Sequence, residues 1–197
     1  MNGFLLIVLV LTGIAVLWSV LLTLQVHEHK RYVRKSLRSR PGKWHVAPAV
    51  LVCVPCKGLD LDLAIHLRSV VTQDYPNYRV RFIVESVEDA ACAVIQQIMS
   101  ETTVPCELFV AGVCTESGQK VHNLRRATSE LPDDVKVLVF FDSDARPPAH
   151  AVTRFVDRCC RGGLEVATGY RWFVPRHLNL ANLTLASINA AVAGLMK

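Results

Sequence analysis

The sequence predicts an α/β fold, in which a mostly parallel sheet is covered by helices and is preceded by one membrane helix. Two observations support this prediction. Short apolar runs typical of buried strands alternate with stretches of helical periodicity, and residues 1–26 contain no charged side chain. Alternating strands and helices imply parallel strands joined by crossover helices, and such sheets bind ligands at the carboxyl ends of their strands.

The first apolar run predicts a membrane anchor over residues 1–26. Its uncharged part, "GFLLIVLVLTGIAVLWSVLLTLQV", has 24 residues, and a helix needs about 20 such residues to cross a bilayer. A secretory signal peptide is the alternative. It fits less well because no basic residue precedes the run, the run is too long, and no small-x-small cleavage site follows.

A basic segment, residues 27–43, follows the anchor. It carries seven Lys or Arg residues and one Glu, so its net charge is +6, whereas the whole chain carries +5. The rest of the chain is therefore close to neutral, and we expect no nucleic-acid partner because no basic face remains for one. Basic residues beside a single span stay on the cytoplasmic side and bind anionic lipid, which predicts a single-pass protein with a cytoplasmic domain on the membrane.

The first half of the domain, which we place at 44–175, alternates regularly. "AVLVCVP" (49–55) predicts a buried strand that Pro closes, and residues 61–73 have helical periodicity. Residues 79–86 are strand-like after the turn "DYPNY". Residues 88–101 predict a helix with Glu and Asp in its first turn, and "CELFVAG" (106–112) predicts a third strand.

The second half continues the pattern. Residues 118–131 predict a helix, and "KVLVFFDSD" (136–144) is the strongest strand of the chain. A helix over 148–160 and a strand over 164–173 follow. The apolar tail, 176–197, predicts the start of an interfacial or acceptor-side helix.

Cys53 and Cys56 form a C-x-x-C, a spacing that suggests a redox dithiol or half of a zinc site. In a strand, however, residues three apart lie about 10 Å apart and face opposite sides, too far for a disulfide. No second Cys/His pair has zinc-like spacing. We therefore expect both cysteines to be small apolar residues of the first strand.

Asp142 and Asp144 follow the strongest strand directly. In an extended chain, residues two apart point to the same side, and two close carboxylates favour a bound cation. Oxygen ligands at this spacing suit Mg²⁺ or Mn²⁺, which commonly also binds substrate phosphates. The alternative is a solvated turn, in which Asp and Ser are common.

Other polar residues follow earlier strands. Glu85 could accept hydrogen bonds from a ribose or a base, whereas Glu88 and Asp89 are better explained as stabilising a helix N-terminus. Lys120 and Asn123 share one face of a helix that follows a Gly-containing loop. A Lys and an amide there suit a diphosphate or a pyrimidine ring, although a surface Lys is more often simply solvated.

Three stretches together resemble the inverting, membrane-bound glycosyltransferases of family 2, and especially the ceramide glucosyltransferase-like branch, family 21. They are "LRSVVTQDYPNYRV", the K-x-x-N of "KVHN", and the D-S-D at 142–144, which closes the strand predicted over 136–144. The resemblance covers residues 48–175. It implies a GT-A fold, a UDP-sugar donor, a divalent metal, and an acceptor that is a lipid or another membrane-associated molecule.

The resemblance also assigns site residues. It matches the D-S-D to the metal and sugar-diphosphate motif, with Asp144 the favoured metal ligand, and it matches Glu85 to a uridine contact where Asp is more usual. The donor-binding residues that it implies are Pro55, Lys57, Glu85, Lys120, Asn123 and Asp142, and the metal ligands are Asp142 and Asp144.

The chain departs from the family pattern after the D-S-D. Members continue to a third acidic residue that acts as general base, then to a (Q/R)-x-x-R-W motif and further membrane helices. We do not count Arg171-Trp172 as that motif, because it lies too early. We expect the general base beyond Lys197, and hence a truncated chain that binds donor weakly and transfers poorly.

Two other functions fit parts of the pattern. An inactive membrane scaffold could have kept the fold without the chemistry. A phosphatase with an aspartyl nucleophile also places D-x-D after an apolar strand, but there the motif stands near the start of the domain, and Arg146 is not the residue type expected after it. We rank both below the glycosyltransferase.

Overall fold

The computed structural model of the chain describes residues 3–38, 44–170, 175 and 177–195. The chain divides into two compact units. One comprises Met1–Arg40 together with Gly169–Lys197, and the other comprises Pro41–Thr168.

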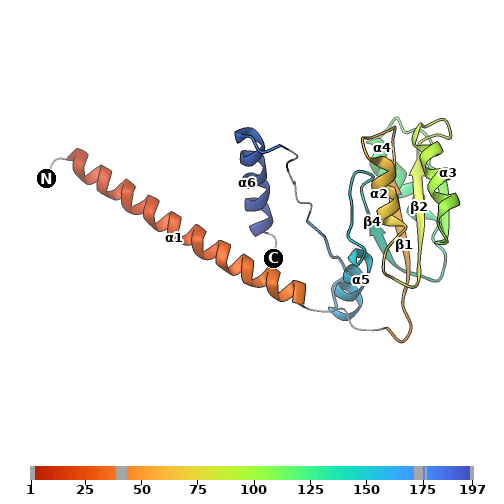
Figure 1. Cartoon of the computed structure of the whole chain (residues 1–197), viewed down its shortest axis with the longest axis horizontal. Helices are drawn as coiled ribbons and strands as arrows, with labels where there is room; N and C mark the ends of the chain where they lie inside the picture. Colours follow the sequence, from red (N-terminus) through yellow and green to blue (C-terminus); the bar gives the residue numbers. More distant parts are fainter. Residues whose placement is uncertain (1–2, 39–43, 171–174, 176, 196–197) are drawn as a thin grey trace. The chain divides into compact units, whose positions relative to one another are not determined.

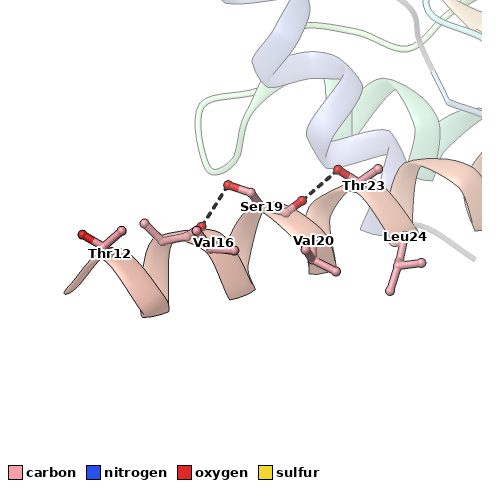
Figure 2. A pocket seen from close by; sticks show the side chains of 7 residues that line it. Thr12, Val16, Ser19, Val20, Thr23 and Leu24 are labelled. Carbon is pink, nitrogen blue, oxygen red and sulfur yellow. Dashed lines mark hydrogen bonds between the residues drawn. The ribbon is translucent and has the colours of Figure 1, made fainter. Parts of the chain in front are cut away.

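Helix α1, Gly3–Arg38, is a single helix of 36 residues. Its part Gly3–Glu28 is long and apolar enough to cross a membrane, and no other helix among the described residues meets both conditions. Figure 2 shows side chains that line a hollow along this helix, where the hydroxyls of Ser19 and Thr23 donate to carbonyls one turn back. The helix continues into the basic segment because Lys and Arg are good helix formers.

The unit Pro41–Thr168 contains the four strands of the sheet and the helices between them (Figure 1). The strands are β1 (Ala49–Pro55), β2 (Tyr78–Val84), β3 (Cys106–Val110) and β4 (Val135–Phe140). The helices are α2 (Leu63–Val70), α3 (Ala91–Glu101), α4 (Gln119–Ser129), α5 (Ala151–Val156) and the π-helical turn η1 (Asp157–Arg161). Helix α6, Leu180–Leu195, belongs to the other unit.

The described sheet has the order β3-β2-β1-β4, and every pairing is parallel. Val52 lies at the centre, opposite Val80 on one side and Val139 on the other. This is the predicted α/β architecture of parallel strands connected by helices. The order also brings the carboxyl ends of all four strands to one edge, where the predicted site residues follow.

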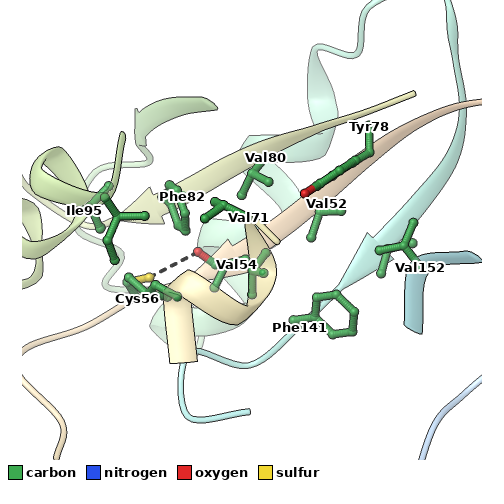
Figure 3. Close-up of a cluster of buried hydrophobic side chains, with 14 of the residues drawn as sticks. Val52, Val54, Cys56, Val71, Tyr78, Val80, Phe82, Ile95, Phe141 and Val152 are labelled. Carbon is green, nitrogen blue, oxygen red and sulfur yellow. Dashed lines mark hydrogen bonds between the residues drawn. The ribbon is translucent and has the colours of Figure 1, made fainter. Parts of the chain in front are cut away.

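Alternate residues of the strands face opposite layers. Val52, Val54 and Phe82 point into the larger core, which α2, α3 and α5 cover (Figure 3). Leu51 and Ile83 point to the other face, where α4 packs. The central strands β1 and β2 are therefore mostly buried, which explains why β1 is an apolar run without polar alternation.

Cys53 and Cys56 lie on different faces of the sheet, and both thiols are buried and free. Burial raises the pKa of Cys53 to about 11 and that of Cys56 to about 12. Both side chains are thus neutral at physiological pH. Both lie among apolar side chains, as expected for small apolar residues, although Cys56 comes just after β1.

Two expected helices begin later than predicted. Helix α2 starts at Leu63 because Asp62 has a left-handed backbone, φ 69°, which Asp tolerates better than most residues. Helix α3 starts at Ala91, so Glu88 and Asp89 stand in the turn before the helix and not in its first turn. The Asp89 carboxylate, one residue before the N-cap Ala90, accepts the backbone N–H of Ala91 at 2.8 Å and so satisfies one donor at the helix start.

The expected strand over 164–173 is not formed in its described part. Residues 164–170 are irregular, and 171–174, with Arg171-Trp172, lie outside the described residues. An apolar sequence becomes a strand only where a neighbouring strand pairs with it, and among the described residues only β1 pairs with β4.

The stretch "TQDYPNY" acts at the amino-terminal edge of the sheet, opposite the site. The side chain of Gln73 accepts a hydrogen bond from the backbone of Val152 in α5 and donates one to Ser69. The Tyr75 hydroxyl donates to the carbonyl of Pro48, and Asn77 donates to that of Ala47. This stretch therefore acts as a structural clamp, because it joins α2 and α5 to the segment just before β1.

Candidate functional site

Four loops meet at the carboxyl edge of the sheet, one after each strand. They bring together four predicted site residues as two ion pairs: Lys57 with Glu85, and Lys120 with Asp142. Each pair joins segments that are distant in the sequence, 28 and 22 residues apart. The fold therefore concentrates opposite charges at the edge where α/β proteins bind ligands.

The first pair joins the loops that follow β1 and β2. Lys57 Nζ lies 3.0 Å from Glu85 Oε2, and the lysine is mostly exposed whereas the glutamate is largely buried. Pro55 is the last residue of β1 and is buried opposite Ile83. Pro55 can thus shape the wall of the site only through its backbone and the end of the strand.

Asp89 holds the first of these loops in place, a role that the sequence did not reveal. Its carboxylate accepts the backbone N–H of Gly58 at 2.9 Å in addition to that of Ala91. Gly58 has φ +64°, a conformation that favours glycine. By fixing the residue after Lys57, Asp89 positions that lysine toward Glu85.

The second pair joins α4 to the loop after β4. Lys120 Nζ lies 2.5 Å from Asp142 Oδ1, and both side chains are about half exposed. Lys120 is the second residue of α4, where the backbone N–H groups of the first turn carry partial positive charge. A cationic side chain and a helix N-terminus therefore adjoin one carboxylate of the D-S-D.

The D-S-D itself is a turn, and here the extended geometry expected for it was wrong. Strand β4 ends at Phe140, and the N–H of Ala145 donates to the Asp142 carbonyl at 3.0 Å. The pairing with β1 ends with Cys53 opposite Phe140 and a hydrogen bond from the N–H of Phe141 to the Cys53 carbonyl, so the D-S-D lies beyond the paired residues. Asp142 and Asp144 are both exposed in this turn.

Asn123 is placed differently from the other predicted donor contacts. It is 3% exposed, and its amide oxygen accepts a hydrogen bond from Gln119 Nε2 at 2.6 Å. Gln119 also donates to the carbonyl of Gly112 and accepts the N–H of Cys114. Asn123 thus supports Gln119, which anchors the loop between β3 and α4, and His122 bonds to Ala111 in the same loop.

Arg81 holds the opposite end of α4 and was also missed from the sequence. Its guanidinium is almost fully buried, 2.6 Å from the Glu107 carboxylate and over the ring of Phe109. It donates to the last carbonyls of the helix, those of Ala127 and Glu130. The sequence signal is an Arg placed directly between apolar residues of a strand, because a buried charge needs partners.

The carboxylate oxygens at this edge suit a hard divalent cation whose remaining coordination positions are filled by a bound ligand. No group of three His, Cys, Asp or Glu side chains in the described part of the chain could hold a metal alone. Mg²⁺ and Mn²⁺ are commonly bound by one or two carboxylates plus substrate phosphates and water, which Asp142 and Asp144 can supply. The residues present therefore fit a metal that arrives with a phosphorylated ligand.

The hollow on α1 (Figure 2) is a different kind of surface. Its lining is Thr12, Ala15, Val16, Ser19, Val20, Thr23 and Leu24, which includes no titratable side chain. It runs along the helix that is apolar enough to cross a membrane. Such a surface suits hydrocarbon, and it is not a site for a charged nucleotide.

Residues 7–194, almost the whole chain, match glycosyl transferase family 21. The chain belongs to glycosyltransferase family 21. Its parallel sheet with flanking helices agrees with the GT-A fold that the sequence resemblance implied. This membership favours glycosyl transfer over the phosphatase alternative.

Two solved structures align with part of this chain. The mannosyltransferase PcManGT from Pyrobaculum calidifontis, in complex with GDP-Man and Mn²⁺, aligns with a TM-score of 0.47 and 19% identity over 68% of this chain. S. aureus TarS 1-349 aligns with a TM-score of 0.41 and 15% identity over 56%. The family 21 chain covers 39% and 32% of these two chains, well under two thirds of either.

Proposed function

We propose that this family 21 chain binds a UDP-sugar together with Mg²⁺ or Mn²⁺, as the donor-binding part of a membrane-anchored inverting glycosyltransferase. The observation that supports the proposal best is the pair Lys120–Asp142 at the carboxyl edge of the sheet. It combines a lysine suited to phosphate with a carboxylate suited to the metal. The acceptor that fits a tethered enzyme is a lipid hydroxyl.

Each residue then has a stated task. Lys120, at the start of α4, binds the donor diphosphate, and Asp142 with Asp144 would hold the metal, which supplies positive charge to the departing diphosphate. Glu85 accepts hydrogen bonds from the uridine, with Lys57 beside it. Gln119 and Asn123 keep the β3–α4 loop in place.

The reaction is a displacement at the anomeric carbon of the sugar. The acceptor hydroxyl oxygen forms the new bond to that carbon while the bond to the UDP oxygen breaks, so the configuration inverts. The acceptor proton must pass to a general base, for which we assign no residue among those described. The contribution of the described residues is to bind and orient the donor and to stabilise the charge on UDP.

We further propose that α1 anchors the chain in the membrane and that the domain lies on the cytoplasmic side. The support is the basic segment that directly follows the apolar part of α1. Protease added outside intact cells should leave the domain uncut, and cleavage of the domain there would contradict this orientation.

Calorimetry tests donor binding. The full chain in neutral detergent should bind UDP more tightly with Mn²⁺ than without it, and Asp144→Ala should abolish most of that metal dependence. Asp133→Ala is the matched control, because it removes one carboxylate from the amino-terminal side of β4. If the wild type shows no metal-dependent UDP binding, the inactive scaffold becomes the better interpretation.

A further inference from the structure

Lys120 and Asp142 neutralise each other although each is proposed to bind a different part of the donor complex. Their charged atoms lie 2.5 Å apart. With Lys120 in this position, the Asp142 carboxylate already has a cationic partner. The same arrangement recurs at Lys57 and Glu85, so the edge holds its opposite charges in pairs.

We propose that Lys120 occupies the metal's position beside Asp142 while no donor is bound, and that donor binding gives both residues new partners. The diphosphate takes the Lys120 ammonium, and Asp142 is released to the divalent cation. Lys120 thereby makes the binding of metal and nucleotide interdependent. The inference rests on the proposed donor-binding function, which it deepens.

The exposure and chemistry of the pair permit such an exchange. The side chains of Lys120 and Asp142 are 59% and 48% exposed, and ion pairs at this exposure are weak and salt-sensitive. Lysine is a flexible point charge with rotatable donors, so it can leave the carboxylate for a phosphate a short distance away. A buried, bidentate pair such as one made by arginine would exchange far less readily.

The exchange has a thermodynamic consequence that a static lysine lacks. If Lys120 stayed beside Asp142 in every state, its removal would raise the affinity for Mn²⁺ equally with and without nucleotide. If Lys120 moves to the diphosphate when nucleotide binds, its removal raises the affinity for Mn²⁺ mainly when nucleotide is absent, because only then does the lysine occupy Asp142. By linkage, the factor by which Mn²⁺ improves UDP binding equals the factor by which UDP improves Mn²⁺ binding, and removal of the lysine should reduce both.

The test uses the full chain in nanodiscs of phosphatidylcholine, which lacks the anionic headgroups that would bind metal. Mn²⁺ affinity is measured by electron paramagnetic resonance of the free ion, with and without saturating UDP. The variants are Lys120→Met, Lys120→Arg, and Lys136→Met as a charge-matched control on β4, where Lys136 lies near the amino end of the strand. Circular dichroism confirms that each variant is folded.

We expect Lys120→Met to bind Mn²⁺ alone about 1.5- to fivefold more tightly than the wild type, the range that exposed ion pairs support. Its coupling factor between Mn²⁺ and UDP should fall by a similar ratio, whereas Lys136→Met should stay near the wild type. Lys120→Arg keeps the positive charge beside Asp142 and should therefore not gain affinity for Mn²⁺ alone. An unchanged coupling factor, or a gain in Mn²⁺ affinity no larger than that of Lys136→Met, overturns the exchange. If the wild type binds no UDP with Mn²⁺, the proposed function fails as well, so the two failures are distinguishable.

Discussion

Arg81→Met tests whether the buried guanidinium fixes the helix that carries Lys120. Methionine keeps much of the apolar volume in β2 but removes the donors that reach Glu107, Ala127 and Glu130. A hydrogen bond to a charged group contributes roughly 1.5–3 kcal/mol. Since the Glu107 side chain is 49% exposed, water can replace its lost partner, so the contributions do not simply add.

We therefore expect Arg81→Met to lower the free energy of unfolding by about 2–4 kcal/mol, near the lower end of the range for a broken buried pair. Urea unfolding of the full chain in detergent measures it. Trp44 is a suitable probe, because it packs against the core and lies 4.0 Å from the Arg161 guanidinium. Replacing Trp18 and Trp172 by Phe leaves it as the only tryptophan of the chain.

Glu107→Gln completes a double-mutant cycle with Arg81→Met. It keeps an acceptor for Arg81 Nε but removes the counter-charge of an arginine that is 6% exposed. The loss of unfolding free energy when both substitutions are made together should therefore be about 1–3 kcal/mol smaller than the sum of the two single losses. If Arg81→Met changes the unfolding free energy by less than about 0.5 kcal/mol, Arg81 does not hold the end of α4 and the reasoning is refuted.

Two further predictions concern the loops of the edge. Asp89→Ala should lower the free energy of unfolding by about 1 kcal/mol, the usual effect of losing a helix cap, and should weaken UDP binding because Gly58 loses its anchor; normal UDP affinity would show that the loop does not need Asp89. The hydrogen bond from Ser117 lowers the pKa of the Cys114 thiol, whereas burial raises that of Cys56 to about 12. A lower pKa means more thiolate at a given pH, so iodoacetamide at pH 7.5 should alkylate Cys114 well before Cys56, and Ser117→Ala should slow that reaction. Peptide mass spectrometry measures both rates, and equal rates would contradict the assignment.

The strands could be predicted from the sequence because their signal is local. β1 was predicted at its observed bounds, since "AVLVCVP" is apolar on both faces and ends in Pro. The predicted end of β4 was wrong because no local signal shows that pairing with β1 stops at Phe140. For the same reason the strand over 164–173 was predicted from apolar residues alone, without a partner to pair with.

The site residues could be predicted one by one, but their pairing could not. Lys57 and Lys120 were each chosen as donor contacts, yet nothing in the sequence indicated that each lies against a predicted acidic residue. That arrangement depends on the strand order, which brings the ends of β1, β2 and β4 together. Gln119 was missed for a related reason, because its three hydrogen bonds reach residues on a loop and on α4 that only the fold assembles.

The exposed ion pairs also bear on the choice between an enzyme and an inactive scaffold. A scaffold needs the clamp around Gln73, the buried Arg81 and the two apolar cores, all of which stabilise the fold. Exposed pairs such as Lys120–Asp142 contribute only about 0–1 kcal/mol, so stability gives little reason to place them there. Their position at the carboxyl ends of parallel strands is where ligand chemistry requires charge. The charges that the fold does not need are the ones that donor binding would use, which favours the donor-binding interpretation of this family 21 domain.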